Sequence, residues 1–150
     1  MNHKLRILIL FLLVAISLPS GAQPKNKLHF NADGTFKIAQ FTDIHFKPGV
    51  PESEPSIDLI KYILETERPD LVAFTGDIVT GRPAADGWKT VLEPVVKAGI
   101  PFAVTLGNHD DEHDLSRPQI RELLKTFPGY IGVKPDAKSE FGDYLVKVNA

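Results

Sequence analysis

The chain contains no cysteine among its 150 residues, and only one methionine and one tryptophan. The absence of cysteine excludes disulfide bonds and thiolate metal sites. Lysine and arginine form no stripe and no patch interleaved with aromatic residues, and acidic residues outnumber basic ones by 19 to 17. Proteins that bind nucleic acid neutralise its phosphates with lysine and arginine, so we expect no nucleic-acid partner.

Long apolar runs are also scarce, and the one that stands out covers residues 7–18. It follows two basic residues and precedes the small residues of segment 20–22, which is typical of a secretory signal peptide cleaved before Gln23. Because the run is shorter than the roughly 20 residues of a transmembrane helix, we expect no stable membrane anchor after cleavage, with an uncleaved anchor as the alternative. The pattern predicts a signal peptide over residues 1–22 and an exported protein, either periplasmic or secreted.

Residues 23–150 are predicted to form one domain. Residues 1–22 hold two of the 17 basic residues and no acidic residue, so the other 128 residues carry 15 basic and 19 acidic side chains and a formal charge of −4. This length suffices for a single hydrophobic core. With no disulfide available, the stability of an exported domain must come from that core.

Three short polar motifs each follow an apolar, strand-like run. The runs are residues 36–41, 71–75 and 102–106, and the motifs that follow them are Asp43-Ile44-His45, Gly76-Asp77 and Gly107-Asn108-His109-Asp110. Asp77 lies 34 residues after Asp43, and Asn108 lies 31 residues after Asp77, which fits two successive βαβ units of about 30 residues each. Parallel strands end at one edge of a sheet, so we expect the motifs to converge there.

Helical periodicity occupies the segments between and after these runs. A first helix is expected to begin at Ser56, with an apolar face made of Ile57, Leu59, Ile60, Ile63 and Leu64. A second helix is expected over residues 85–98, kinked or split by Pro94. A capping box at residues 116–119 opens a third helix, and residues 144–148 are predicted to form a further strand.

In this order, the three motifs resemble the first three motifs of the calcineurin-like metallophosphoesterases. Segments 36–45 and 107–111 are most similar to the purple-acid-phosphatase-related group, and the resemblance covers roughly residues 36–148. It implies an α/β sandwich built from βαβ units, with a metal site at the C-terminal strand ends. The chain would correspond to the N-terminal half of that sandwich.

The resemblance also implies a role for each motif residue. Asp43 and His45 would bind a first metal ion, Asp77 would bridge two ions, and Asn108 would bind the second. Two metal ions about 3.5 to 4 Å apart hold a hydroxide, polarise phosphoryl oxygens and neutralise developing charge. Imidazole, carboxylate and amide ligands without thiolate favour iron, manganese or zinc.

His109 and Asp110 are the implied catalytic pair. His109 would lie near the scissile phosphate, where it stabilises charge or protonates the leaving oxygen, and Asp110 would orient and charge its ring. Thr80 departs from the purple enzymes, which place a tyrosine three residues after the bridging aspartate. No purple iron–tyrosinate centre is therefore expected.

The ligand set is short for two metal ions. Family members supply further histidines from later motifs, whereas this chain has no histidine after His113. Four ligands cannot fill two coordination spheres that need about four each. We therefore expect the chain to be an N-terminal portion that is incomplete at its C-terminus.

The function implied by the resemblance is that of a hydrolase acting on phosphoric ester bonds, an exported phosphatase that uses a metal-activated hydroxide. Its substrate would be a small phosphate ester or a phosphoprotein. The alternatives are a truncated, non-catalytic metal- or phosphate-binding remnant and a structural or interaction domain that kept the fold. Each motif alone is also compatible with ordinary turn residues, and the charged cluster 111–114 is interpreted as a solvated loop rather than an extra metal site.

Overall fold

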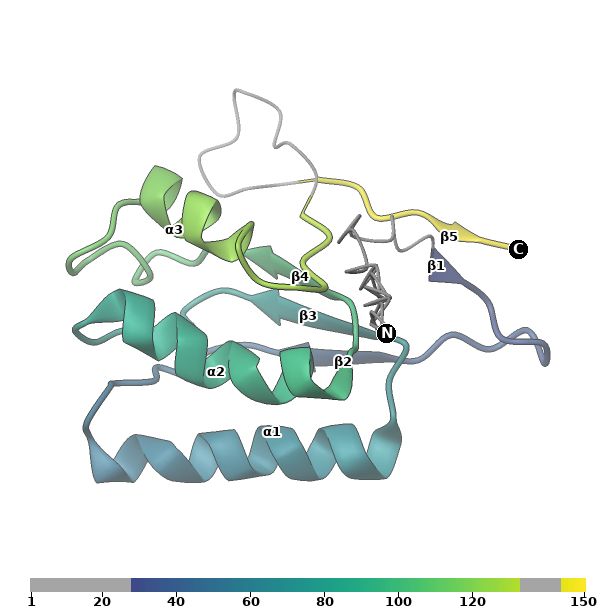
Figure 1. Ribbon diagram of the computed structural model, residues 1–150, viewed down its shortest axis with the longest axis horizontal. Coiled ribbons are helices and arrows are strands. Elements are labelled where there is room, and N and C mark those ends of the chain that lie inside the picture. The colour runs from purple at the N-terminus through teal and green to yellow at the C-terminus, as the bar shows by residue number, and fades with distance from the viewer. Residues whose placement is uncertain (1–27, 133–143) are drawn as a thin grey trace, which may run out of the picture.

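The computed structural model describes residues 28–132 and 144–150 of the chain. It is a mixed α/β arrangement in which three parallel strands lie beside three helices (Figure 1). The predicted signal peptide at residues 1–22 falls outside the described residues. Among the residues that are described, no helix has both the length and the apolar character needed to cross a membrane.

The three strands of the main sheet are β2 (Ile38–Phe41), β3 (Leu71–Thr75) and β4 (Phe102–Thr105). They run parallel in the order β2-β3-β4, so β3 is the central strand. Their positions confirm the strands predicted from the apolar runs, although β2 starts two residues later than expected and β4 ends one residue earlier. The order also confirms two successive βαβ units.

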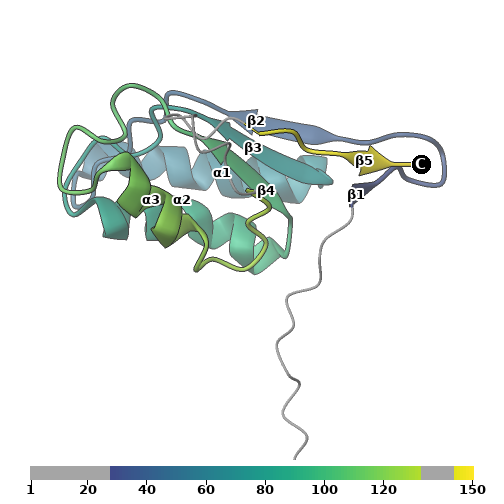
Figure 2. The same cartoon turned by 90° about the horizontal axis from the view of Figure 1, so that it is seen from above.

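Three helices cover one face of this sheet (Figure 2). They are α1 (Glu54–Glu67), α2 (Ala84–Ala98) and α3 (Arg117–Leu124), and a short 3-10 turn, η1 (Pro51–Ser53), leads into α1. Apolar side chains of the strands and the helices meet between the layers. The largest of those that are almost completely buried are Trp88, Phe46, Phe74, Phe102, Ile60, Ile78, Leu92 and Ile120.

The first helix differs from the prediction at its start and at one position of its apolar face. It begins at Glu54, two residues before the expected cap at Ser56. Ile57, Ile60 and Leu64 are buried as predicted, but Leu59 is 57% exposed, so its assignment to the apolar face is wrong. The buried stripe of the helix is therefore narrower than the sequence suggested.

The second helix is one element over 15 residues with Pro94 inside it. Of the two expected effects of this proline, the split is therefore wrong, and the kink stays a prediction. A proline removes one backbone hydrogen bond, but Val91, Leu92 and Val95 around it are completely buried in the core. This packing keeps the helix in one piece. The third helix has the expected capping box, in which the Ser116 N–H donates to Gln119 Oε1 at 2.8 Å.

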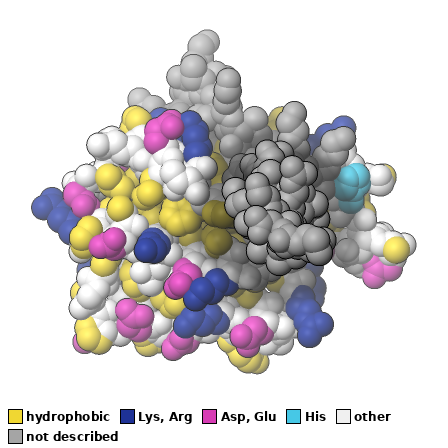
Figure 3. Space-filling model, viewed as in Figure 1, with side chains coloured by type: hydrophobic (Ala, Val, Ile, Leu, Met, Phe, Trp, Pro, Cys, Tyr) yellow, Lys and Arg dark blue, Asp and Glu magenta, His cyan; other side chains and the backbone are white. Residues whose placement is uncertain are grey.

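Charged side chains of both signs are scattered over the outer surface of the helices, between hydrophobic and uncharged polar groups (Figure 3). Each helix carries an exposed ion pair three or four residues apart, namely Lys61–Asp58, Lys97–Glu93 and Lys125–Glu122. Pairs of this kind stabilise a helix by only a few tenths of a kcal/mol. Their main effect here is to balance positive charge with negative charge across this face.

The free edge of β4 is covered by side-chain and backbone groups instead of a fourth strand. The Tyr144 hydroxyl accepts from the Val104 N–H at 2.7 Å and donates to the Val104 carbonyl at 3.1 Å. Two backbone hydrogen bonds cover Phe102 on the same edge: the Phe102 N–H donates to the Gly129 carbonyl, and the Ile131 N–H donates to the Phe102 carbonyl. The strand predicted over residues 144–148 is confirmed only at its end, because β5 (Val148–Asn149) pairs with β1 (Leu28–His29).

Candidate metal centre at the carboxyl ends of the strands

The three predicted motifs occupy loops that leave neighbouring strands at the same edge of the sheet. Asp43 and His45 follow β2, Asp77 follows β3, and the Asn108–His109 pair follows β4. The first two loops stay paired beyond the strands, because the Asp43 N–H donates to the Gly76 carbonyl at 3.0 Å and the His45 N–H donates to the Asp77 carbonyl at 2.9 Å. The sheet thus brings together residues that are more than 30 positions apart in the sequence.

Asp43, His45 and Asp77 form a group that could hold a metal ion. Each offers one ligand atom, and these atoms all lie within 4.8 Å of one another. Asp43 and His45 are exposed, and Asp77 is half-buried. Two carboxylates and one imidazole are donors that suit iron, manganese or zinc, so the residues present fit the kind of ion that the sequence predicted.

The backbone at all three positions is left-handed. Asp43, His45 and Asp77 have φ values of 54°, 49° and 54°, and in the described part of the chain Arg68 is the one further non-glycine residue with positive φ. Arg68 ends α1, which is an ordinary place for this conformation. The other three lie outside any helix end, and backbone strain of this kind clusters at functional sites.

Two glycines allow the β3 and β4 loops to approach each other closely. A Cβ added at Gly107 would lie 2.2 Å from Asp77 Oδ1, and a Cβ added at Gly76 would lie 2.8 Å from the Gly107 Cα. Real Cβ atoms do not approach so closely, so a side chain at Gly107 would displace Asp77 and a side chain at Gly76 would displace the backbone of Gly107. The close packing of the two loops thus explains why a glycine precedes Asp77 in one motif and Asn108 in the other.

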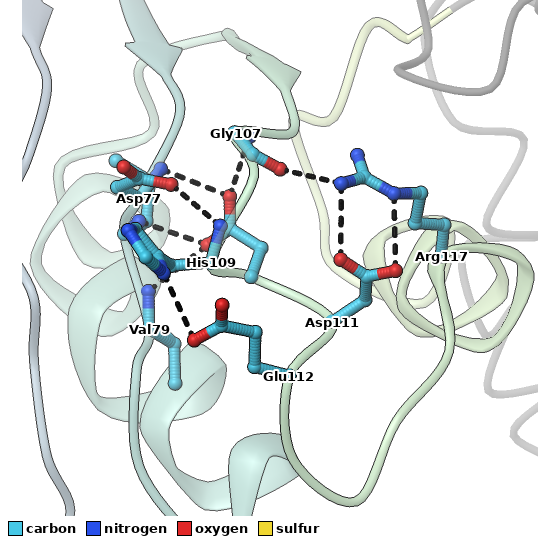
Figure 4. A network of polar contacts seen from close by, with 9 residues as sticks. Asp77, Val79, Gly107, His109, Asp111, Glu112 and Arg117 are labelled. Carbon is cyan, nitrogen blue, oxygen red and sulfur yellow. Dashed lines mark hydrogen bonds and ion pairs between the residues drawn. The ribbon is translucent and has the colours of Figure 1, made fainter.

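Asp110 is the most buried acidic group of the site, with 1% of its surface exposed. Its carboxylate accepts four backbone N–H groups at 2.8 to 3.1 Å, from Asp77, Ile78, Val79 and Gly107 (Figure 4). Hydrogen bonds from backbone amides to a carboxylate are among the strong ones in proteins. Asp110 therefore ties the β4 loop to the β3 loop and fixes the backbone on which Asp77 is carried.

The partner of the His109 ring is Glu112 and not Asp110, which corrects the predicted pairing. His109 Nδ1 lies 2.9 Å from Glu112 Oε2. The hydrogen bond to Glu112 raises the pKa of His109 above its ordinary value, burial opposes this, and the charges of Glu112, Asp77 and Asp110 add to it. Asp110 thus contributes charge, but its own hydrogen bonds go to the backbone.

His109 lies next to the candidate metal group. Its backbone N–H donates to Asp77 Oδ1 at 2.9 Å, and its ring centre is 5.7 Å from the ring centre of His45. Asn108 is exposed beside it in the same loop. The metal-binding role of Asn108 stays a prediction.

Thr80, three residues after Asp77, is buried and its N–H donates to the Phe46 carbonyl at 3.0 Å.

The charged cluster 111–114 is solvent-accessible as expected, with Glu112 and Asp114 exposed and Asp111 and His113 half-buried, and two of its carboxylates also make structural contacts. Asp111 forms a two-pronged ion pair with Arg117 at 3.0 and 3.1 Å, and Arg117 Nη2 also donates to the Gly107 carbonyl at 2.8 Å (Figure 4). Asp114 Oδ1 accepts from the Ala84 N–H at 2.9 Å, at the first residue of α2. A helix start offers N–H groups without intrahelical partners, so Asp114 satisfies one of them.

Sequence reasoning missed the contributions of Glu112 and Arg117. Glu112 stands three residues after His109, a spacing at which one turn of chain brings side chains together, and this spacing is a signal that could have found it. The role of Arg117 carries no comparable sequence signal, because it depends on a contact with a backbone carbonyl ten residues earlier.

Known proteins resemble this chain over most of its described length. The family model for calcineurin-like phosphoesterase matches residues 36–148. The chain is 35% identical to "Probable inactive purple acid phosphatase 28" of Arabidopsis thaliana, over 83% of this chain and 39% of that protein. These matches confirm the resemblance to the purple-acid-phosphatase-related group.

Two further relatives carry names of different activities. The chain is 36% identical to "Phosphatase DCR2" of Saccharomyces cerevisiae, over 73% of this chain and 21% of that protein. It is 38% identical to "Probable cyclic nucleotide phosphodiesterase" of Psychrobacter arcticus, over 63% of this chain and 39% of that protein. The chain spans less than half the length of each of these relatives. No solved structure matches it.

Proposed function

We propose, because this chain belongs to the calcineurin-like phosphoesterase family, that it carries part of the metal site of an exported, metal-dependent phosphoesterase. The single observation that carries the proposal is the convergence of Asp43, His45 and Asp77 within 4.8 Å at the ends of two parallel strands. Oxygen and imidazole donors at that spacing suit the metal ions that this chemistry uses.

Asp77 is the proposed bridging ligand because of its place in the sheet. It follows β3, the central strand, and so lies between the loop of Asp43 and His45 and the loop of Asn108. Asp43 and His45 are proposed to serve one metal ion and Asn108 a second. Bound there, metal ions would polarise the phosphoryl oxygens and offset the negative charge that develops on them.

His109 is proposed to act on the substrate directly. Its N–H bond to Asp77 fixes it beside the metal group, and its raised pKa favours the charged ring. A charged imidazole stabilises negative charge on a phosphate, and it holds the proton that a leaving alkoxide or phenoxide needs. The substrate class is a phosphate ester, and both a phosphatase and a phosphodiesterase occur among the names of the relatives.

Metal binding by the purified chain tests this proposal. Isothermal titration with Mn²⁺ and Zn²⁺ should show binding that falls at least about tenfold in Asp77→Asn and His45→Ala, because each loses a ligand. Asp58→Asn on the outer surface of α1 removes one carboxylate elsewhere and should bind like the unchanged chain. Equal affinity in all four proteins, or no binding by the unchanged chain, would overturn the assignment.

Hydrolysis is the second measurement, and it separates the two candidate functions. The alternative is a non-catalytic metal- or phosphate-binding domain, which is favoured by the word "inactive" in the name of the Arabidopsis thaliana relative. Turnover of p-nitrophenyl phosphate or bis(p-nitrophenyl) phosphate that requires metal and is lost in Asp77→Asn supports the enzyme. Because the chain spans less than half the length of these relatives, the assay is repeated on a chain extended through the downstream reading frame, and metal binding without turnover in both proteins supports the alternative.

Export is proposed on the apolar run at residues 7–18 and the small residues at 20–22. Expression of the full chain in a bacterial host, followed by mass spectrometry of the periplasmic fraction, tests it. A mature chain that starts at Gln23 supports cleavage and export. A chain of full mass that stays in the cytoplasm or the membrane contradicts this part of the proposal.

A further inference from the structure

The ring of His109 has a dedicated carboxylate, and it is not the one beside it in the motif. Asp110 uses both of its oxygens on four backbone N–H groups. Asp111 uses both of its oxygens on Arg117. Glu112 is the next acidic residue, and its Oε2 lies 2.9 Å from His109 Nδ1.

A turn of the backbone brings Glu112 to the ring. The Glu112 N–H donates to the His109 carbonyl, three residues back, at 3.4 Å. This places both side chains on the same side of the turn, where Figure 4 shows the carboxylate of Glu112 directed at the imidazole. The contact therefore joins two side chains of one turn, residues 109–112.

The backbone of His109 is already fixed before the ring contact is considered. Its own N–H donates to Asp77 Oδ1, and the next residue is held by four amides. What these contacts leave free is rotation of the ring about its side-chain bonds. A hydrogen bond at Nδ1 restricts this rotation and leaves Nε2 as the ring nitrogen for another partner.

We propose that Glu112 is a positioning residue, which holds His109 through Nδ1 so that Nε2 is the nitrogen presented to the phosphate ester; this inference rests on the proposed function of the site. A carboxylate only accepts hydrogen bonds, so Nδ1 must carry the hydrogen in this contact. In the charged ring Nε2 then holds the proton for the leaving oxygen. In the neutral ring Nε2 is an acceptor.

The geometry distinguishes this role from that of a metal ligand. A metal-bound histidine also donates its second nitrogen to a carboxylate, but the compact group of ligand atoms contains Asp43, His45 and Asp77 and does not contain His109. The His109 ring lies next to this group, because its centre is 5.7 Å from the ring centre of His45. That place suits a group that acts on the substrate.

Exposure makes the role testable without unfolding the chain. The side chains of His109 and Glu112 are 41% and 53% exposed. Exposed pairs of this kind contribute little to stability. Variants at Glu112 should therefore fold, and any change at His109 can be read as loss of position.

The test is the tautomer of the neutral His109 ring in the metal-free chain, measured by long-range ¹H–¹⁵N correlation spectroscopy with signals assigned through His109→Gln. The unchanged chain should show the hydrogen on Nδ1. Glu112→Ala should shift the ring towards the tautomer with the hydrogen on Nε2, whereas Glu112→Gln should keep it on Nδ1, because the amide oxygen still accepts. Glu122→Ala, which removes an exposed glutamate on α3, is the matched control and should change nothing.

An Nε2-bound hydrogen in the unchanged chain, or no difference between Glu112→Ala and the control, would overturn the proposal. A kinetic comparison adds a second arm if the chain hydrolyses phosphate esters. Glu112→Ala should then lower kcat by roughly tenfold for phenyl phosphate and by less for p-nitrophenyl phosphate, whose leaving group needs no proton. An equal loss for both substrates counts against positioning. Absence of metal binding in every variant defeats the proposed function, while the tautomer still decides the role of Glu112.

Discussion

Asp43 and Asp110 lie in the loops that follow the two outer strands of the sheet, and they show how one residue type takes two opposite environments. Asp43 is exposed, has left-handed backbone, and belongs to the group that could hold a metal ion. Asp110 is 1% exposed and accepts four backbone N–H groups. The comparison indicates that some residues of the site hold the loops together, and this leaves others free to bind a metal ion.

The largest expected effect is on stability, and it separates the two aspartates. Asp110→Asn replaces an acceptor oxygen by an amide group that meets backbone N–H donors, so we expect the free energy of unfolding to fall by about 3 kcal/mol. Asp43→Asn makes the same chemical change at an exposed position and should stay within about 0.5 kcal/mol of the unchanged chain. Urea denaturation of both variants measures the difference. Similar losses of unfolding free energy in the two variants would contradict the different roles assigned to the two aspartates.

A smaller effect is expected where the two loops touch. Gly107→Ala places a methyl group against Asp77 Oδ1, and overpacking of this kind should cost about 2 kcal/mol. Gly34→Ala is the control, because it has open space around it and only an unfavourable φ of 79°, so about 1 kcal/mol is expected. Thermal unfolding orders the two variants. The Gly107 variant should also bind metal more weakly, and unchanged binding would show that Asp77 need not be held by this contact.

The smallest effect concerns the charge on His109. Its pKa lies above the ordinary value of 6.5, with the Glu112 hydrogen bond as the largest cause, so Glu112→Gln should lower it. A raised pKa means that the pair stabilises the folded chain at low pH, below the pKa of the unfolded state, and that this contribution is lost as the pH rises through the folded pKa. NMR titration of the metal-free chain measures the shift. An unchanged or higher pKa in the variant would contradict the assigned cause.

The strands and the motif positions could be predicted because their signals are local. An apolar run followed by a turn residue defines each strand, and the predicted bounds of β3 are the observed ones. The spacing of the motifs along the chain then suffices to place Asp43, His45 and Asp77 at one edge of the sheet. The spacing suffices because all carboxyl ends of parallel strands lie at the same edge of the sheet.

Other features could not be predicted because they depend on contacts between distant segments. The sequence shows Asp110 next to His109, but it does not show that the N–H groups of three residues more than 30 positions earlier point at its carboxylate. Pro94 alone predicts a break in α2, and only the buried valines around it explain the continuous helix. Leu59 shows the limit of periodicity, because it has the right spacing for the buried face and is exposed.

The left-handed backbone at Asp43, His45 and Asp77 also limits which residues can occupy these positions. Apart from glycine, the residues most often found there are asparagine, aspartate and histidine. Two of the commonest metal-binding side chains, those of aspartate and histidine, are therefore also among those that the backbone tolerates best. Selection for folding alone, applied to a library randomised at these three positions, would return a set rich in metal ligands. The shape of the loops therefore limits which residue types can occupy these positions, independently of any metal ion or substrate.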